Sequence, residues 1–212
     1  MSNSSNDEPR FPGEIGESGC RILPLFPLPD LILFPGQLVP VHVFEPRYRQ
    51  MAQDLLDNTG EIVLGTVLGD DQEQLGEVAP IQPVAGLGRL QRYQALEDGR
   101  YLLMILGEKR VRVIQRIEEK VYPLAEVDDL VEEDVDIDWE QAEELKNAIG
   151  ELEHNIDLPE GTSAVQMSDL LIMITPMTVE NRYELFSNPS IEDRVVKIIE
   201  LQDSIEDDNP FD

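Results

Sequence analysis

The spacing of hydrophobic residues changes once along the chain. From Ile22 to about Val131, short apolar runs are separated by prolines, glycines and acidic loops, a pattern typical of β-strands. From about Asp138 to Gln202, apolar residues recur at intervals of three and four, which predicts amphipathic helices. This order predicts an α+β protein in which a strand-rich half precedes a helical half.

One helix is expected inside the strand-rich half. Strands are predicted near 22–26 and 39–44, and Pro46 then suits the first position of a helix, where a missing N–H is no loss. The predicted helix ends near Gly60. Its apolar residues fall on one face: Tyr48, Met51, Ala52, Leu55 and Leu56.

The rest of this half is a predicted meander. Segments 86–96 and 101–106 flank Asp98-Gly99, a strong hairpin signal, and strands at 110–117 and 121–131 follow. Residues 101–106 are all apolar without alternation, so we expect that strand to be covered on both faces. Several short twisted strands with one packed helix predict a small, partly closed mixed β-barrel.

Helix boundaries in the second half are marked by capping residues. Asp138 is a predicted N-cap, Ser163 with Gln166 and Ser190 with Asp193 resemble capping boxes, and Pro176 should end a helix. Four amphipathic helices are therefore expected to pack as a helical bundle. The predicted organisation is a disordered arm at 1–20, a barrel at 21–131, a helical part at 138–203 and a flexible acidic tail at 204–212.

Several motifs in this order resemble the N-terminal substrate-binding domain of Lon proteases. They begin with LPLFPLP at 23–29, LFPG at 33–36 and H-x-FEPRYR at 42–49. The similarity continues through DGRYLLMILGEKRVRV at 98–113, YPLAEV at 122–127 and NPSIEDRVVKIIELQ at 188–202. The resemblance implies a PUA-like barrel followed by a small helical bundle, and a domain that binds polypeptides.

A complete Lon protease also carries an ATPase module and a peptidase module, which this sequence does not match. No G-x-x-x-x-G-K-[ST] motif is present to hold nucleotide phosphates, so ATP hydrolysis is not expected. The resemblance therefore implies a stand-alone, non-catalytic module, an adaptor or sensor in protein quality control and proteolysis. Its expected partners are unfolded or flexible polypeptides; docking onto a separate protease or ATPase, and the oligomeric state, stay open.

The candidate polypeptide-binding residues lie in the opening motifs. The proline-rich entry segment is expected to expose apolar surface, and an extended peptide is expected to pair with a barrel edge strand. Glu45, Arg47 and Arg49 either bind a peptide carboxylate or form an internal ion pair, and we favour the ion pair. The candidate set is Leu31, Leu33, Phe34, Phe44, Arg47 and Tyr48.

Charge argues against nucleic acid as the main partner. The net charge is −28, from 16 basic and 44 acidic side chains, which repels polyanions and anionic membranes. Half of the basic side chains fall between Arg89 and Lys120, and PUA-like folds bind RNA in other families. An RNA-associated protein is therefore the alternative hypothesis, with a basic patch of Arg89, Arg92, Arg110, Arg112 and Arg116.

No metal, cofactor or membrane segment is predicted. Cys20 is the single cysteine, and His42 and His154 are too few for a zinc site. His42 is interpreted as a structural histidine in preference to a general base. The acidic run at 134–138 lacks the glycine and glutamate of a calcium loop. Without a signal peptide or a long apolar run, a cytoplasmic protein is expected.

Overall fold

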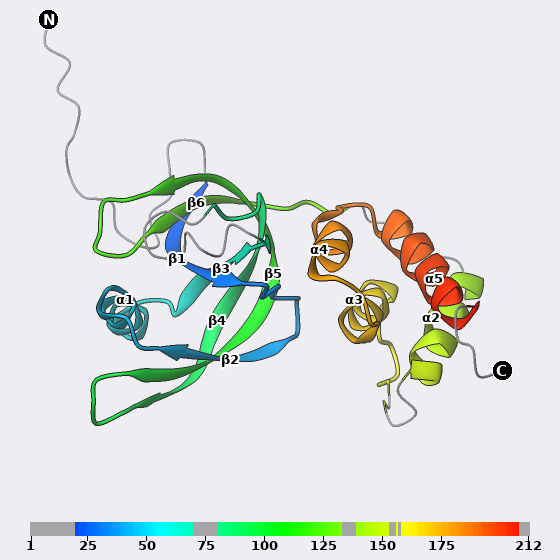
Figure 1. Cartoon of the computed structure of the whole chain (residues 1–212), viewed down its shortest axis with the longest axis horizontal. Coiled ribbons are helices and arrows are strands. Elements are labelled where there is room, and N and C mark those ends of the chain that lie inside the picture. Colours follow the sequence, from blue (N-terminus) through cyan, green and yellow to red (C-terminus); the bar gives the residue numbers. More distant parts are fainter. Residues whose placement is uncertain (1–19, 70–79, 133–138, 153–155, 157, 208–212) are drawn as a thin grey trace, which may run out of the picture. The chain divides into compact units, whose positions relative to one another are not determined.

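The chain divides into two compact units between Asp129 and Leu130. The computed structural model describes residues 20–69, 80–132, 139–152, 156 and 158–207. Figure 1 labels six strands and α1 in the first unit and helices α2 to α5 in the second. Residues 1–19 and 208–212, where we expected a flexible arm and most of the flexible tail, lie outside the described residues.

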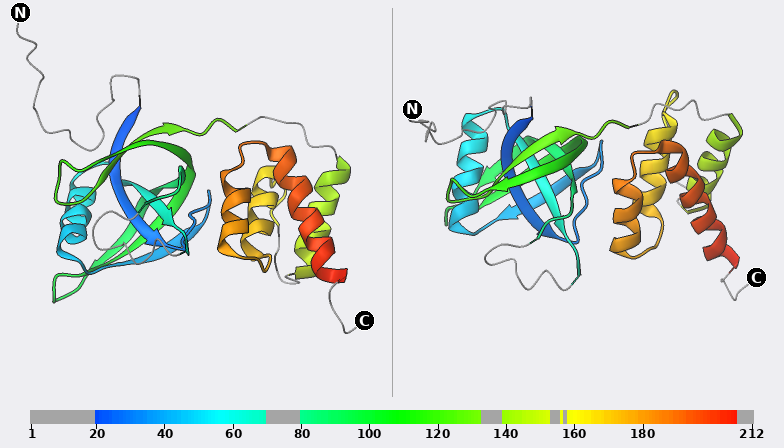
Figure 2. Two further views of the ribbon diagram at one scale, coloured as in Figure 1. Left: turned by 45° about the horizontal axis from the view of Figure 1, so that its top comes forward. Right: turned by 90° about the horizontal axis from the view of Figure 1, so that it is seen from above.

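One mixed sheet forms the first unit (Figure 2). The strand order is β2-β5-β4-β3-β1-β6; β1 runs parallel to β3, and the other pairs are antiparallel. The second half of the long strand β5 also pairs with β6, so the sheet curls strongly. The elements are β1 (Arg21–Pro29), β2 (Leu38–Val43), α1 (Pro46–Asp57), β3 (Glu61–Val67), β4 (Val84–Ala95), β5 (Tyr101–Ile117) and β6 (Leu124–Asp129).

The α+β class is confirmed, and the curled sheet is not a closed barrel; the sequence predicted only partial closure. A seam stays open between β1 and β2, because β2 pairs only with β5 and the end of β1 pairs only with β3. The PUA-like assignment of the sheet stays a prediction.

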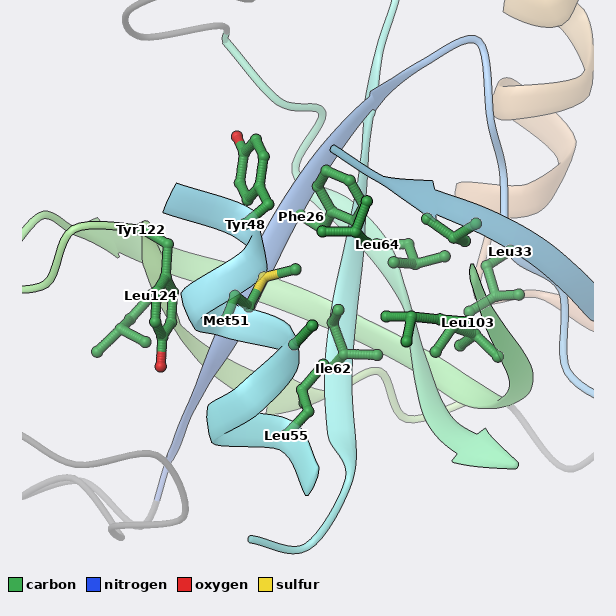
Figure 3. Close-up of a cluster of buried hydrophobic side chains, with 14 of the residues drawn as sticks. Phe26, Leu33, Tyr48, Met51, Leu55, Ile62, Leu64, Leu103, Tyr122 and Leu124 are labelled. Carbon is green, nitrogen blue, oxygen red and sulfur yellow. The ribbon is translucent and has the colours of Figure 1, made fainter. Parts of the chain in front are cut away.

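Helix α1 packs its apolar face onto the curled sheet. Pro46 lies in its first turn as predicted, and Tyr48, Met51, Ala52 and Leu55 are buried. Figure 3 shows Met51 and Leu55 among side chains from the strands, including Ile62. The amphipathic spacing read from the sequence therefore identified the buried face of this helix correctly.

The LFPG segment between β1 and β2 is clamped against two strand glycines. A Cβ atom on Gly86 would lie 2.4 Å from the carbonyl oxygen of Leu33, and one on Gly107 would lie 2.0 Å from that of Phe34. The turn at the end of this segment places Gly36 at φ +79°, a conformation that glycine adopts readily. The close approach buries both Leu33 and Phe34, each at 1% exposure.

Strands β4 and β5 form the predicted hairpin, with Gly99 at φ +79° in its turn. The expectation that residues 101–106 are covered on both faces is wrong. Leu103 and Ile105 are buried, whereas the side chain of Leu102, the residue before Leu103, is 42% exposed. This part of β5 therefore has one buried face and one exposed face, and the exposed face also carries apolar side chains.

The described residues of the second unit form four helices: α2 (Trp139–Leu152), α3 (Ala164–Ile174), α4 (Val179–Ser187) and α5 (Ile191–Asp207). Helix α2 contacts α3 and α5, and α3 also contacts α4 and α5. The capping box at Ser163 and Gln166 is present, and α3 ends before Pro176 as predicted. Asp138, the predicted N-cap of α2, lies outside the described residues, and α5 continues past 204, where we expected a flexible tail.

A buried ion pair lies inside the second unit. The Arg194 side chain is fully buried, and its Nη1 lies 2.8 Å from a carboxylate oxygen of Glu132 and 3.5 Å from one of Asp169. Asp169 is also buried. None of the helices in the described ranges is long and apolar enough to cross a membrane.

Candidate functional site

A cavity of about 320 Å³ opens between the end of β1 and the end of β2. Its walls are mainly apolar, and we call it the seam cleft. The lining residues are Phe26, Pro27, Leu28, Pro29, His42, Phe44, Glu45 and Tyr48. Four of these eight residues belong to LPLFPLP and the other four belong to H-x-FEPRYR, so the two opening motifs meet at one place.

Prolines keep the β1 side of the seam cleft without N–H donors. Backbone groups of successive strand residues point to alternate edges, and the N–H of Leu25 donates to the carbonyl of Pro123, on the edge away from β3. Pro27 and Pro29 share that edge with Leu25, two and four residues further on. Because proline has no N–H, β1 offers no donor there and cannot form a full ladder with β2.

Strand β2 supplies the opposite wall with an open edge. The N–H of Gly107 donates to the carbonyl of Gln37, so in the observed register the odd-numbered residues of β2 direct their backbone groups to β5. Leu38, Pro40 and His42 therefore direct theirs away from β5. No backbone hydrogen bond joins Leu38 or His42 to another residue in the described ranges on that edge.

Aromatic side chains form the inner end of the seam cleft. The rings of Phe26 and Tyr48 lie 4.5 Å apart between centroids, at one end of the buried cluster in Figure 3. Arg47 stacks on the Tyr48 ring, with its guanidinium carbon 4.6 Å from the centroid. Burial raises the pKa of the Tyr48 hydroxyl, an effect that the Arg47 charge opposes without reversing it. Tyr48 is therefore both a core residue and part of the cleft wall.

Phe44 and His42 form the exposed rim. The Phe44 side chain is 56% exposed, and its ring centroid lies 5.8 Å from that of His42. The carbonyl of Phe44 accepts a 2.6 Å hydrogen bond from Arg49, which fixes the backbone where the strand leads into α1. A bulky apolar ring is thus held at the surface by a rigid backbone.

The charged residues after β2 are engaged with one another and with the backbone. Glu45 accepts a hydrogen bond from Arg47 at 3.0 Å, and Arg49 also donates to the carbonyl of Asp98 at 3.2 Å. These contacts agree with the internal ion pair favoured from the sequence. They argue against a binding site for a peptide carboxylate at this turn.

The structure separates the six predicted binding residues into two groups. Phe44 and Tyr48 line the seam cleft, and Arg47 stacks behind Tyr48. Leu33 and Phe34 are buried, so their side chains are not available to a partner, and Leu31 is half-buried and packs on the core. The expectation that the entry segment is exposed is wrong, because Gly86 and Gly107 have no side chains and let the backbone of Leu33 and Phe34 pack directly on the sheet.

Six cleft residues were not among the predicted binding residues: His42, Glu45 and four residues of β1. Phe26, Pro27, Leu28 and Pro29 come from the end of β1. A sequence signal for them exists, since prolines at positions i and i+2 of one strand remove both N–H groups from the same edge.

The predicted basic patch does not form. Arg110 is 2% exposed and lies over the Phe34 ring at 5.7 Å, Arg89 pairs with Glu108 and Glu61, and Arg116 pairs with Glu118. Only Arg92 and Arg112 of the five predicted residues are exposed at the surface. Of the other three, Arg110 is buried, and Arg89 and Arg116 are paired with carboxylates, so the RNA alternative is not supported.

Within the described ranges, no group of three or more His, Cys, Asp or Glu side chains is placed to hold a metal ion. The acidic run at 134–138 lies outside those ranges. A second hollow of about 310 Å³ lies in the second unit between α4 and α5. An ion pair between Glu184 and Lys197 lies on its wall, so it is more polar than the seam cleft.

Known proteins are similar to this chain in sequence and in fold. Residues 22–203 match the family described as the ATP-dependent protease La (LON) substrate-binding domain. The chain is 22% identical over 194 residues to Lon protease 2 of Desulfotalea psychrophila, covering 85% of this chain and 25% of that protein. It is 24% identical to the Lon protease of Aquifex aeolicus, covering 89% of this chain and 22% of that one. The chain therefore spans about a quarter of the length of these relatives.

Two solved structures agree with this result at the level of the fold. A Lon N-terminal domain protein from Xanthomonas campestris superposes with a TM-score of 0.66 at 20% identity, covering 84% of this chain and 96% of that one. The N-terminal domain of a Mycobacterium avium complex Lon protease gives a TM-score of 0.64 at 14% identity, with 86% and 98% coverage. The chain belongs to the family of Lon substrate-binding domains.

Proposed function

We propose that this chain is a polypeptide-binding module whose binding site is the seam cleft. Membership of a family described as a substrate-binding domain supports the general activity, since the substrates of a protease are polypeptides. The main support for placing the binding site in the seam cleft is an apolar cavity beside a strand edge that prolines leave open. An exposed aromatic ring at its rim, Phe44, suits contact with apolar side chains of an unfolded segment.

In this proposal the module performs no chemistry of its own. It holds unfolded or flexible segments and acts as an adaptor or sensor in protein quality control, with a Lon-type protease as the partner that degrades the bound chain. Clefts of this kind bind through apolar contacts and a few polar groups. Flexible partners lose entropy on binding, so dissociation constants in the micromolar range are expected.

Titration of a fluorescently labelled, reduced and carboxymethylated α-lactalbumin tests the proposal. Phe44→Asp should raise the dissociation constant about tenfold or more, because it replaces the exposed ring with a charge at an apolar site. Ile114→Asp is the matched control, since Ile114 is also an exposed strand residue, at 52% against 56% for Phe44, and does not line the cleft.

Each outcome has a defined meaning. Weakened binding by Phe44→Asp alone, with unchanged circular dichroism, supports the cleft as the site. Equal weakening by both variants would indicate a general charge effect. No binding to the wild-type protein would contradict the proposed function itself.

A further inference from the structure

The open edge of β2 offers a specific set of backbone groups. Leu38 and His42 each direct an N–H and a carbonyl away from β5, while Pro40 between them directs only a carbonyl. The two donors are four residues apart, which corresponds to about 13 Å along an extended strand. A ligand that satisfies both must itself be extended over about five residues.

The side chains around this edge suit a strand better than a compact ligand. Leu38 is 51% exposed, and Leu102, which pairs with His42 in the ladder, is 42% exposed. These side chains continue the apolar surface from Phe44 along the outer face of β2 and β5. Successive residues of an added strand point to opposite faces, so every second side chain would meet this surface or the cleft.

Prolines in β1 and β2 explain why the outer edge of β2 stays unpaired within the described residues. Pro27 and Pro29 deny β2 the donors that would close the seam from the β1 side. Pro40 shortens the usable ladder, a device that protects edge strands from uncontrolled pairing between copies. The edge is thus open but selective, which is the requirement for reversible peptide binding.

We propose that the bound polypeptide adds as a strand to the free edge of β2, through the backbone groups of Leu38 and His42. This inference rests on the proposed function and specifies how the substrate is recognised. The occupant is an extended segment with apolar side chains at alternate positions and neutral or basic side chains between them. Acidic segments are disfavoured by the net charge of −28.

Strand addition makes a prediction that apolar docking does not, because only every second backbone N–H of the ligand faces β2. The probe is an acetylated and amidated eight-residue peptide in which phenylalanine and valine alternate with threonine and lysine. Methylating one backbone nitrogen at a time should weaken binding about tenfold at alternate positions and about twofold or less at the others.

A pair of substitutions at one position tests the same idea on the protein. His42→Pro removes an outward N–H, and His42→Thr removes the imidazole but keeps the N–H and suits a strand. Proline already occurs at the outward position Pro40, so the fold accepts it in this strand. Both variants lack the imidazole at the cleft rim, so their difference reports the lost N–H: the parent peptide should bind about fivefold or more weakly to His42→Pro than to His42→Thr.

The outcomes separate this inference from the proposed function. Alternating sensitivity to methylation, together with weaker binding by His42→Pro than by His42→Thr, supports strand addition. Uniform tolerance of methylation, while the parent peptide binds and Phe44→Asp weakens it, would overturn strand addition and leave the cleft as the site. If neither the peptide nor unfolded α-lactalbumin binds, both proposals fail. A dimer in sedimentation that His42→Pro dissociates would show that a second copy occupies the edge, and would overturn the inference.

Discussion

Gly107→Ala should destabilise the first unit strongly, although it adds one methyl group. The new Cβ would lie 2.0 Å from the carbonyl oxygen of Phe34, whereas ordinary contact begins at 3.4 Å. The LFPG segment would therefore have to move by about 1.4 Å away from a close-packed sheet. Overpacking of this kind costs 1–3 kcal/mol, and partial exposure of Leu33 adds to it, so we expect a loss of about 3 kcal/mol.

Urea unfolding monitored by circular dichroism measures this loss, with Gly65→Ala as the matched control. Both glycines are buried in strands, but a Cβ on Gly65 would meet the side-chain ends of Ile81 at 2.9 Å and Leu25 at 3.0 Å, which can move. We expect the control to lose about 1 kcal/mol or less. Equal losses in the two variants, or a loss below about 1 kcal/mol in Gly107→Ala, would refute the clamp.

Three further predictions concern interactions inside each unit. Burial alone would raise the pKa of the Asp54 carboxyl, but hydrogen bonds, first among them that from the Tyr122 hydroxyl, lower it. Tyr122→Phe should therefore reduce the free energy of unfolding in urea by about 2 kcal/mol at pH 7. The reduction should become smaller as the pH falls below about 4, where the carboxyl protonates. Arg194→Met should cost about 3–5 kcal/mol because Asp169 stays buried, and a second change, Asp169→Leu, should recover much of the loss; failure to recover would contradict the ion-pair argument. Ser163→Ala removes the cap of α3 and should cost about 1 kcal/mol, and an unchanged unfolding midpoint would exclude a stabilising role.

Local patterns in the sequence predicted the local structure well. Pro46 and the apolar spacing after it identified α1 and its buried face, and Asp98-Gly99 identified the hairpin. The capping box at Ser163 is equally local. Each of these features depends on residues within a few positions of one another, so no knowledge of the fold is needed to recognise it.

Burial could not be predicted where it depends on distant residues. Leu33 and Phe34 are buried because Gly86 and Gly107, far along the chain, leave room for their backbone. Arg110 was expected at the surface, yet it is buried, with its guanidinium group against the Phe34 ring of the same segment. The binding residues taken from the entry segment were therefore partly wrong, although the motif containing them was recognised correctly.

The seam cleft is a similar case. Phe44 was predicted as a binding residue, but its cleft neighbours Pro27 and Pro29 were not. Their role depends on which edge of β1 their backbone faces, which follows from the pairing of β1 with β3 and β6. Strand pairing is set by the whole fold, so the sequence pattern indicated an edge without locating the cleft.

Site-specific photo-crosslinking tests the central claim most directly. Benzoylphenylalanine would replace Phe44 at the cleft rim in one protein and Ile114, away from the cleft, in another, each mixed with unfolded α-lactalbumin. The account predicts crosslinks from position 44 that excess unlabelled peptide abolishes, and few from position 114. Equal crosslinking from both positions, or none from position 44, would contradict it.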